Sequence, residues 1–430
     1  MKQFEMKRID LLIALLLLFF PVSEYINWKP LGYLDELLGV FCLFYLLCAL
    51  MRGKLNRNEG CILILMFGIV LLGVLSNVFS GLVTNLFVIG VDVLEFLKAV
   101  VVFLGFHVFY RKYDVKDLGY HLKGIAKTII IAAFICAVIS QFGDIGMTMR
   151  HADGNIYPEY GIQPFGFVSR NGIQTYYLLS GCLLFIVAGE KKRIVKRIYV
   201  VLYFITTFLT AATLVWCGNL FLITFFIYYK YRKQLKIEML IGIAAIAIVI
   251  AFPAIQEYIF NARAPRSVLL YYGFLTANTY FPFGSGFATY GGEMAARYYS
   301  PLYWAYGFDD RYGLSHTGYG GILNDNYVAM IVAQMGYVGL ILFGVVYFRL
   351  FKLFDYKKLD RKIKPIIMSV FGVIVCSLMI SANSKTLMGV WIHAIMGMCT
   401  ATCIEEDKTT VYEAGEKDKC KSKYILSDAV

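Results

Sequence analysis

The chain has 430 residues, of which 59% are hydrophobic and 16% charged, and its mean hydropathy is +0.65. This composition excludes a soluble globular protein with an ordinary charged surface and predicts an integral membrane protein. The formal net charge of +12 comes from basic loops between apolar runs. It therefore indicates orientation in a membrane, and we expect no nucleic-acid partner.

Long, continuous apolar runs predict an all-α polytopic fold, because a helix needs about 20 apolar residues to cross the hydrocarbon. We expect about twelve transmembrane helices in a single transmembrane domain, 1–403, followed by a charged cytoplasmic tail, 404–430. The expected spans are 9–26, 33–51, 61–78, 87–108, 126–141, 171–189, 198–213, 215–229, 238–253, 327–348, 366–382 and 386–402. The alternative for 198–229 is one long kinked helix.

Lysine and arginine predict the orientation of these spans. With a cytoplasmic N-terminus, the segments on the cytoplasmic side hold 31 of these residues and the segments on the other side hold 8. This bias is the positive-inside pattern, and a single crossing over 198–229 would scramble it. We therefore expect both termini in the cytoplasm and two long segments outside, 142–170 and 254–325.

The larger outer segment, 254–325, contains eleven Tyr, ten Gly and four Arg but no Lys. Long ordered loops on one face of a membrane bundle usually cover or form a site. Pro265 is typical of a first helical residue and predicts a short helix at the membrane interface. Aromatic residues such as Trp304 alternate with charges further along, which suits stacking on sugars or a place at the headgroup level.

Arginine is preferred over lysine on the outer side, where there are six Arg and two Lys, against 9 Arg and 22 Lys inside. Orientation needs only positive charge, whereas the planar guanidinium grips phosphate oxygens with two bonds. The predicted diphosphate ligands are Arg150, Arg170, Arg263, Arg266, Arg297 and Arg311. Alternatively, individual arginines pair with nearby acids and fold the loop. Arg170 and Arg266 stand beside predicted helix starts, whose positive ends also favour phosphate.

Asp325 and His316 are the candidate catalytic bases. Asp325 lies at the mouth of a predicted span, where low polarity can raise the pKa of a carboxylate; its alternative role is an N-cap of that helix. His316 is a lone histidine among glycines and could equally be a surface residue. The adjacent Asp309 and Asp310 could bind a divalent ion or form a local salt bridge, and we expect neither metal nor cofactor.

Asp92, Glu95 and Lys98 share one face of the predicted span 87–108. Charges inside a membrane are costly and are normally partnered. The three residues are interpreted as a self-neutralising cluster that anchors the bundle, with a proton relay as the alternative.

Three stretches resemble the landmarks of bacterial O-antigen polymerases and ligases. They are GIQPFGFVSRNGIQTYYLLSG, APRSVLLYYGFLTANTYFPFGSGFATYG and NDNYVAMIVAQMGYVGLILF, within residues 140–350. The resemblance implies a helical membrane glycosyltransferase fold with one large extracytoplasmic loop.

The resemblance extends to individual residues. Arg150, followed by Gly161, is similar to an arginine and glycine pairing of polymerase outer loops, and Asn171 resembles the asparagine that opens the next span. Arg266 stands where the family has an arginine ahead of a P-x-G-x-G stretch. The corresponding residues here are Pro282, Gly284 and Gly286. The residues expected to bind substrate sugars or to shape the loop are Asn171, Gly284, Gly286, Trp304 and Asn326.

Asp325 and Asn326 stand where many relatives carry His-Asn and others Asp-Asn. The absence of that histidine favours a polymerase over a ligase. A second departure is Cys217, Gly218 and Asn219, which replace the Ser-Arg often found between the seventh and eighth spans.

The resemblance implies a polymerase that joins oligosaccharide repeat units carried on undecaprenyl pyrophosphate, for O-antigen, capsule or exopolysaccharide. It places the chain in the bacterial inner membrane, with the lipid bilayer, the lipid-linked oligosaccharide, a chain-length regulator and a flippase as partners. The alternatives are an O-antigen ligase, a transporter or flippase of lipid-linked oligosaccharides, and a structural assembly partner without activity.

Overall fold

The computed structural model describes residues 8–23, 29–149, 156–158, 161–231, 249, 252–253, 255–256, 260–261, 263–316, 322–354 and 359–401. All regular elements within these ranges are helical, apart from two isolated β-bridges. In chain order they are α1 (Arg8–Ser23), η1 (Lys29–Tyr33), α2 (Leu34–Met51), α3 (Arg57–Ser80), α4 (Leu86–Phe109), η2 (Tyr110–Lys112), α5 (Val115–Ser140), α6 (Gly172–Gly189), α7 (Arg193–Phe208), α8 (Thr213–Tyr231), α10 (Pro265–Thr279), α11 (Glu293–Arg297), α12 (Pro301–Ala305), α13 (Tyr327–Phe354), α14 (Lys364–Ile380), η5 (Asn383–Lys385) and α15 (Leu387–Ala401).

Five described helices are long and apolar enough to cross a membrane. They cover Leu31–Met51, Arg57–Ser80, Val115–Ser140, Gly172–Gly189 and Tyr327–Phe354. Large apolar side chains on α2 and α3 lie on the outside of the molecule, where Phe44 is 68% exposed and Phe67 is 69% exposed. Soluble proteins rarely expose such surfaces. The chain is thus an all-helical protein whose apolar helices are suited to a membrane.

Every expected span except 238–253 overlaps a described helix, although residues 209–212 at the end of the expected span 198–213 are not helical. The expected span 238–253 is largely outside the described residues, and the expected tail at 404–430 lies entirely outside them. Several apolar helices are shorter than the five above, namely Thr213–Tyr229, Lys364–Ile380 and Leu387–Ala401. The total of twelve crossings therefore stays a prediction.

Residues 198–229 form two helices rather than one kinked helix. α7 ends at Phe208 and α8 begins at Thr213. The backbone reverses between them, where Ala211 has a φ of 52°. Trp216 on α8 donates through Nε1 to the carbonyl of Phe208 at 3.0 Å, which holds the two helix ends together.

Polar side chains determine where several helices begin. The backbone N–H of Asn56 donates to Oε2 of Glu59 at 2.8 Å in a capping box before α3. Asn85, Asp114 and Asn171 accept backbone N–H groups from the first turns of α4, α5 and α6. Each cap satisfies donors that the helix itself leaves unpaired, so an apolar run that follows such a residue starts its helix there.

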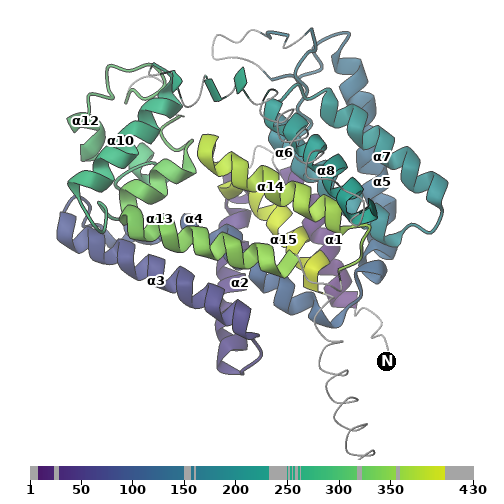
Figure 1. Cartoon of the computed structure of the whole chain (residues 1–430), viewed down its shortest axis with the longest axis horizontal. Coiled ribbons are helices and arrows are strands. Elements are labelled where there is room, and N and C mark those ends of the chain that lie inside the picture. Colours follow the sequence, from purple (N-terminus) through teal and green to yellow (C-terminus); the bar gives the residue numbers. More distant parts are fainter. Residues whose placement is uncertain are drawn as a thin grey trace, which may run out of the picture.

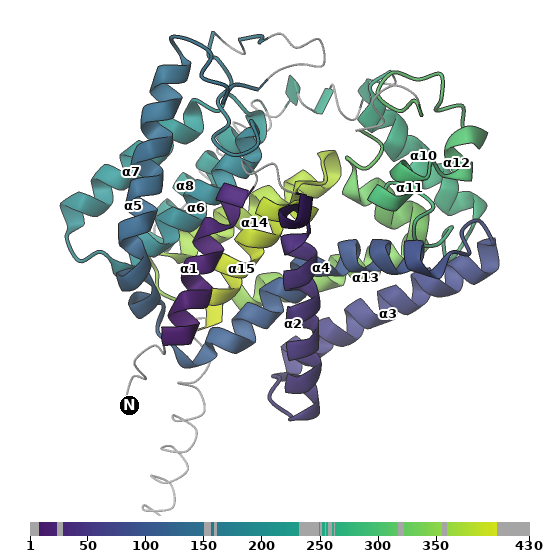
Figure 2. The ribbon, with the colours of Figure 1, turned by 180° about the vertical axis from the view of Figure 1, so that it is seen from behind.

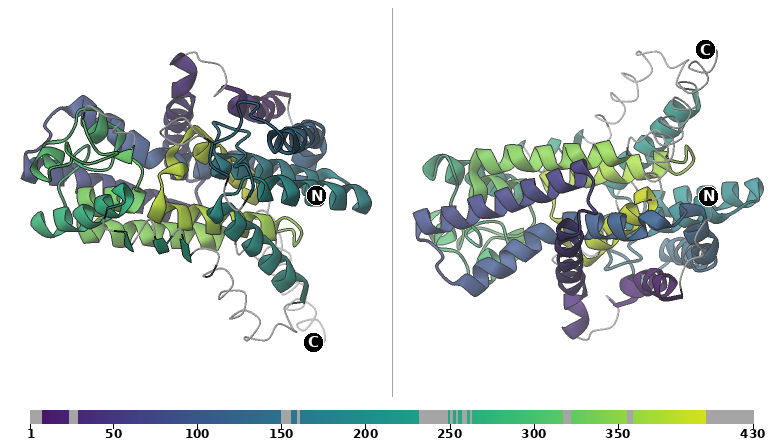
Figure 3. Two further views of the ribbon diagram at one scale, coloured as in Figure 1. Left: turned by 90° about the horizontal axis from the view of Figure 1, so that it is seen from above. Right: turned by 90° about the horizontal axis from the view of Figure 1, so that it is seen from below.

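The segment that is expected to lie outside, 254–325, packs in its described part on two long helices at one end of the molecule. α10 contacts α13, and α13 contacts α3; in Figure 1, α10 and α12 lie together near the ends of these two helices. Seen from below, α3 and α13 run side by side (Figure 3). At the other end α5, α6, α7 and α8 gather, while α4 and α15 cross the middle (Figure 2).

α13 contains a break that receives the outer segment. Gly336 has φ 63° and ψ −169°, which interrupts the helix. The carbonyls of the preceding turn then accept new partners: Ser285 donates its N–H to Ala333 at 2.8 Å, and Gly286 donates to Gln334 at 2.8 Å. The turn after α10 is thereby fixed against the helix that follows the outer segment.

Candidate functional site

An ion pair between Arg266 and Asp325 joins the outer segment to the start of α13. Nε of Arg266 donates to Oδ2 of Asp325 at 2.8 Å, and Nη2 bonds the same oxygen. The other oxygen, Oδ1, accepts the backbone N–H of Ala382 at 3.4 Å, in the turn after α14. The two side chains are 28% and 25% exposed. Three segments thus meet at one charged pair that remains partly accessible.

A cavity of about 350 Å³ lies beside this pair, with Arg266 in its wall. Its other walls come from the start of α6, the turn between α7 and α8, and the turn after α14. The lining residues are Met149, Pro164, Phe165, Asn171, Gly172, Ile173, Thr210, Ala211, Ala212, Thr213, Leu214, Pro253, Arg266, Ile380, Ser381 and Asn383. Its volume is within the range of small-molecule sites, about 300–1,000 Å³.

The amino end of α6 forms one wall of this cavity. Oδ1 of Asn171 accepts the N–H groups of Ile173 at 2.9 Å and Gln174 at 3.2 Å, so Asn171 is the N-cap of α6. A helix start carries a partial positive charge that favours anions. Asn171 was predicted as a substrate-binding residue, and it combines the capping role with a place in the cavity wall.

The turn after α14 supplies polar groups that sequence reasoning missed. Asn383 donates through Nδ2 to Oγ of Ser381 at 2.8 Å, and its carbonyl accepts the hydroxyl of Thr386 at 2.8 Å. The available signal was the polar string SANSK between two apolar runs. From the sequence, this string is a short connection between the expected spans 366–382 and 386–402.

Asn326, rather than Asp325, caps α13. Oδ1 of Asn326 accepts the N–H of Ala329 at 3.0 Å, and Nδ2 donates to the carbonyl of Met379 at 3.2 Å. Asn326 is 1% exposed, so its amide is committed to these backbone groups. The capping role considered for Asp325 therefore belongs to its neighbour, and Asp325 is left to pair with Arg266.

Among the described arginines of the outer segments, only Arg266 lines the cavity. Arg150 lies outside the described residues. Arg170 is exposed, has a φ of 52°, and donates through Nε to the carbonyl of Gly146 at 2.9 Å. This bond connects the last residue of the segment 142–170, just before α6, to the beginning of the same segment.

The other three arginines occupy separate places. Arg263 is exposed. Arg297 forms a surface ion pair with Glu293 one turn earlier on α11, at 3.5 Å. Arg311 lies over the ring of Tyr272, with 5.7 Å between Cζ and the ring centroid. A phosphate role for these three stays a prediction.

A second cavity, of about 340 Å³, contains His316 and Arg297 in its lining. His316 packs against two aromatic rings: its centroid is 5.0 Å from that of Tyr299 and 5.6 Å from that of Trp304. Trp304 is 53% exposed. Burial, with the nearby carboxylates of the 309–310 pair, raises the pKa of Tyr299 to about 12, so its hydroxyl stays protonated at neutral pH. This site is an aromatic surface with a histidine at its edge.

Within the described part of the chain, no group of three or more His, Cys, Asp or Glu side chains is arranged to hold a metal ion. Asp309 and Asp310 are therefore not accompanied by a third such ligand among these residues.

Gly284 and Gly286 shape the turn after α10. Their φ values are 85° and 95°, a region that side chains rarely adopt. A Cβ on Gly284 would lie 2.5 Å from the backbone nitrogen of Gly336, and one on Gly286 would lie 2.6 Å from Asn77. Both glycines therefore permit close backbone contact with α13 and α3.

The charged residues of α4 are buried and paired with other elements rather than with each other. Glu95 contacts Nζ of Lys385 at 2.8 Å, and Lys98 contacts Asp35 and the adjacent carboxylate at the start of α2. Asp92, Glu95, Lys98 and Lys385 are each at most 7% exposed. These pairs fix α2 and η5 against α4.

Asp92 ties the outer segment to the same helix. Its Oδ2 accepts the N–H of Ala288 at 2.7 Å and Nε2 of Gln334 at 2.9 Å. The buried charges thus hold η5, which contains Asn383, and the turn after α10 in fixed positions relative to α4.

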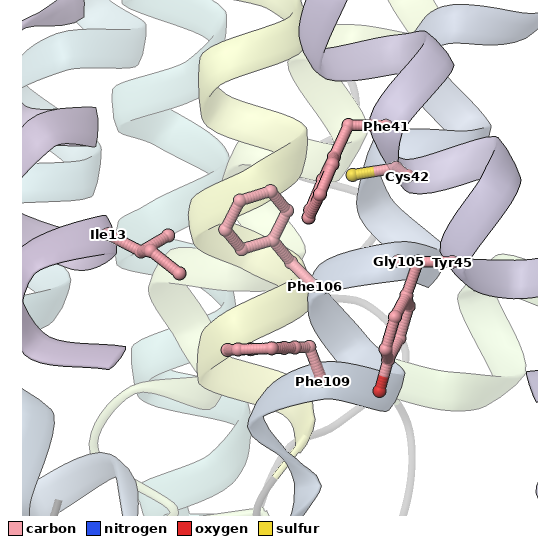
Figure 4. Close-up of a pocket in the computed structure, with 7 residues that line it drawn as sticks. All are labelled: Ile13, Phe41, Cys42, Tyr45, Gly105, Phe106 and Phe109. Atoms are coloured by element: carbon pink, nitrogen blue, oxygen red, sulfur yellow. The ribbon is translucent and has the colours of Figure 1, made fainter. Parts of the chain in front are cut away.

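A small void between α1, α2 and α4 is shown in Figure 4. It measures about 20 Å³ and is lined by Ile13, Phe41, Cys42, Tyr45, Gly105, Phe106 and Phe109. A void of this volume holds about one water molecule. It is too small for a sugar or a diphosphate.

Neither a scan of protein-family models nor a search of curated proteins finds a match to this chain. The fold and the cavity define a helical protein with apolar helices suited to a membrane and, between its two ends, a cavity lined by both apolar and polar residues.

Proposed function

We propose that the chain is a membrane glycosyltransferase that polymerises oligosaccharide repeat units carried on undecaprenyl pyrophosphate. The donor is the nascent lipid-linked glycan, and the acceptor is the terminal sugar hydroxyl of one lipid-linked repeat unit. The protein acts in the bacterial inner membrane, with its termini in the cytoplasm and the cavity on the outer side.

The observation that carries the proposal is the Arg266–Asp325 pair, whose arginine lines a cavity that the amino end of α6 also lines. A guanidinium and a helix start both favour phosphate oxygens. A carboxylate beside them can accept a proton. Transfer from a pyrophosphate donor requires a cation and a base, and both groups lie beside this cavity.

In the proposed reaction the acceptor hydroxyl attacks the anomeric carbon of the donor glycan. The new glycosidic bond forms as the bond from that carbon to the pyrophosphate oxygen breaks. Arg266 stabilises the departing diphosphate, as oriented charge does in other transfer reactions. Asp325 accepts the proton of the attacking hydroxyl. His316 is the alternative base, but it lies in the second cavity, apart from the residues that line the first.

We assign the sugars of the acceptor unit that do not react to the second cavity, whereas its terminal sugar lies beside Asp325. Aromatic faces stack on the apolar faces of sugars, and a charged rim bonds their hydroxyl groups. The exposed ring of Trp304, which packs on Tyr299 beside this cavity, supplies the aromatic face, and Arg297 supplies a charge at the rim. The site supports a polymerase better than a ligase, since the carboxylate of Asp325 occupies the place where many relatives carry a histidine.

A transporter of the same lipid-linked sugars is the second candidate. Buried charges within membrane helices often mark transport paths, and Asp92, Glu95 and Lys98 are buried here. This candidate predicts that neutral substitutions on α4 abolish function while the outer segment tolerates substitution. The polymerase proposal predicts sensitivity at Arg266 and Asp325.

Arg266→Ala tests the proposal in a bacterium whose surface polysaccharide depends on this chain. We expect long-chain polysaccharide to disappear while the amount of protein in the membrane stays normal, because the cation for the diphosphate is lost. Arg52→Ala is the matched control, since it also removes an exposed arginine, in the turn between α2 and α3. Normal polymer length in Arg266→Ala would overturn the proposal.

A further inference from the structure

An apolar groove of about 560 Å³ lies between α6, α7, α8 and the start of α14. These helices stand close together in Figure 1 and contact one another. The groove walls are aliphatic and aromatic, and include Val187 on α6, Val200 and Phe204 on α7, and Leu222 on α8. Its volume is that of a small-molecule site, but its walls offer almost nothing for a polar ligand to bond.

Three cations stand at the mouth of this groove: Lys196, Arg197 and Lys362. Lys196 is partly buried, and its Nζ donates to the carbonyl of Val187 at 2.6 Å. Burial, and then the neighbouring charge of Lys362, lower the pKa of Lys196. Like charges are therefore held together beside an apolar surface, an arrangement that an anion between them would relieve.

Two acidic residues are near these cations, and both have other partners. Glu190 accepts Nζ of Lys127. Asp360 accepts the backbone N–H of Lys362 at 3.0 Å, which shapes the turn before α14. Both also attract Lys196, yet three cations against two committed carboxylates leave an excess of positive charge at the mouth of the groove.

We propose that this groove binds an anionic diacyl phospholipid, with an acyl chain along Val200, Phe204 and Leu222 and the phosphate between Lys196, Arg197 and Lys362. Such a lipid satisfies both halves of the site, because one acyl chain fills the apolar groove and the anionic head meets the three cations. Basic pockets between membrane helices recognise anionic headgroups in this way. The site is separate from the Arg266 cavity and does not depend on the proposed reaction.

Native mass spectrometry of the full chain in detergent tests this assignment, with phosphatidylglycerol and phosphatidylcholine of identical acyl chains as probes. We expect the protein to retain phosphatidylglycerol and to lose phosphatidylcholine. The variant K196Q/R197Q/K362Q should bind phosphatidylglycerol roughly a hundredfold more weakly. The control R52Q/K54Q/R57Q removes three exposed cations from the turn between α2 and α3 and should bind normally.

A second variant tests the apolar part of the groove. Val200→Trp fills the groove and leaves all three cations in place, so it should also lose phosphatidylglycerol. Thermal unfolding without added lipid checks that each variant is folded. Equal retention of the two lipids, or unchanged binding in both K196Q/R197Q/K362Q and Val200→Trp, would overturn the proposal. The latter result would mean that another part of the chain or the detergent fills the groove.

Discussion

Arg266 and Asp325 connect the structure of the site to its proposed chemistry. The guanidinium bonds one carboxylate oxygen with two nitrogen atoms, so an incoming diphosphate would compete with Asp325 for the same fork. In the proposed reaction, diphosphate binding therefore releases Asp325 from its partner. The carboxylate becomes available as a base only when the donor is in place.

Asp325→Asn should abolish the role of residue 325 as the general base. The amide keeps the size of the side chain but cannot accept the proton of the acceptor hydroxyl. Because a general base contributes about a hundredfold or more to rate, we expect the initial rate of polymer formation to fall by at least that factor. Asp310→Asn, an exposed change in the same outer segment, should leave the rate unchanged. A fully active Asp325→Asn protein would assign the base elsewhere.

Asn326 makes a purely structural prediction. Asn326→Ala removes the acceptor for Ala329 and the donor to Met379, so it should lower the free energy of unfolding by about 1–3 kcal/mol. Asn326→Asp keeps the acceptor, so its free energy of unfolding should lie between those of Asn326→Ala and the natural protein. Thermal unfolding in detergent measures the relative stabilities of the three proteins. Equal stability of all three proteins would show that the cap is unimportant.

The sequence predicted the types of residue at the site but not their pairing. Arg266 and Asp325 stood out separately, as a cation beside a helix start and as a carboxylate at the mouth of a span. They are 59 residues apart, and no local pattern encodes such a contact. Thr210, Ser381 and Asn383 could not be singled out from the sequence, because short polar residues in turns are common everywhere.

Among the elements, α5 and α6 show how closely the helices pack. A Cβ on Gly119 would lie 2.6 Å from the backbone nitrogen of Gly189, and a Cβ on Gly189 would lie 2.0 Å from the carbonyl carbon of Gly119. Small residues let membrane helices approach in this way. The contact fixes the carboxyl end of α6, whose amino end lines the cavity.

Gly119→Ala should separate the two helices. We expect it to destabilise the protein by about 1–3 kcal/mol, as overpacking does in other interiors. Gly124→Ala is the matched control on the same helix, since a Cβ there meets nothing within 4 Å. It should be neutral or slightly stabilising. If both variants unfold at the same temperature, the close contact has no energetic weight.

Element positions followed well from local pattern, because apolar run length and polar caps act over a few residues. Pro265 marked the first residue of α10 as expected. The break in α13 at Gly336 was not predicted, since glycine is frequent in membrane helices. Its effect depends on a turn some fifty residues earlier in the chain.

At the scale of the whole molecule, the cavity exists because distant segments converge between the two ends of the bundle. The buried pairs of α4 contribute to this arrangement, and Lys385 illustrates what the sequence could not predict. It falls in a short connection between two expected spans, yet it is buried against Glu95. Such long-range ion pairs fix the assembly, and only the folded chain reveals them.

The length of the products made by the purified protein from synthetic undecaprenyl-pyrophosphate-linked repeat units tests the central claim most directly. We predict products of two or more units that lengthen with time, and single units alone when Arg266 is replaced by Ala. Units that remain single with the natural protein would contradict a polymerase, and units moved across a vesicle membrane without being joined would support the transporter instead.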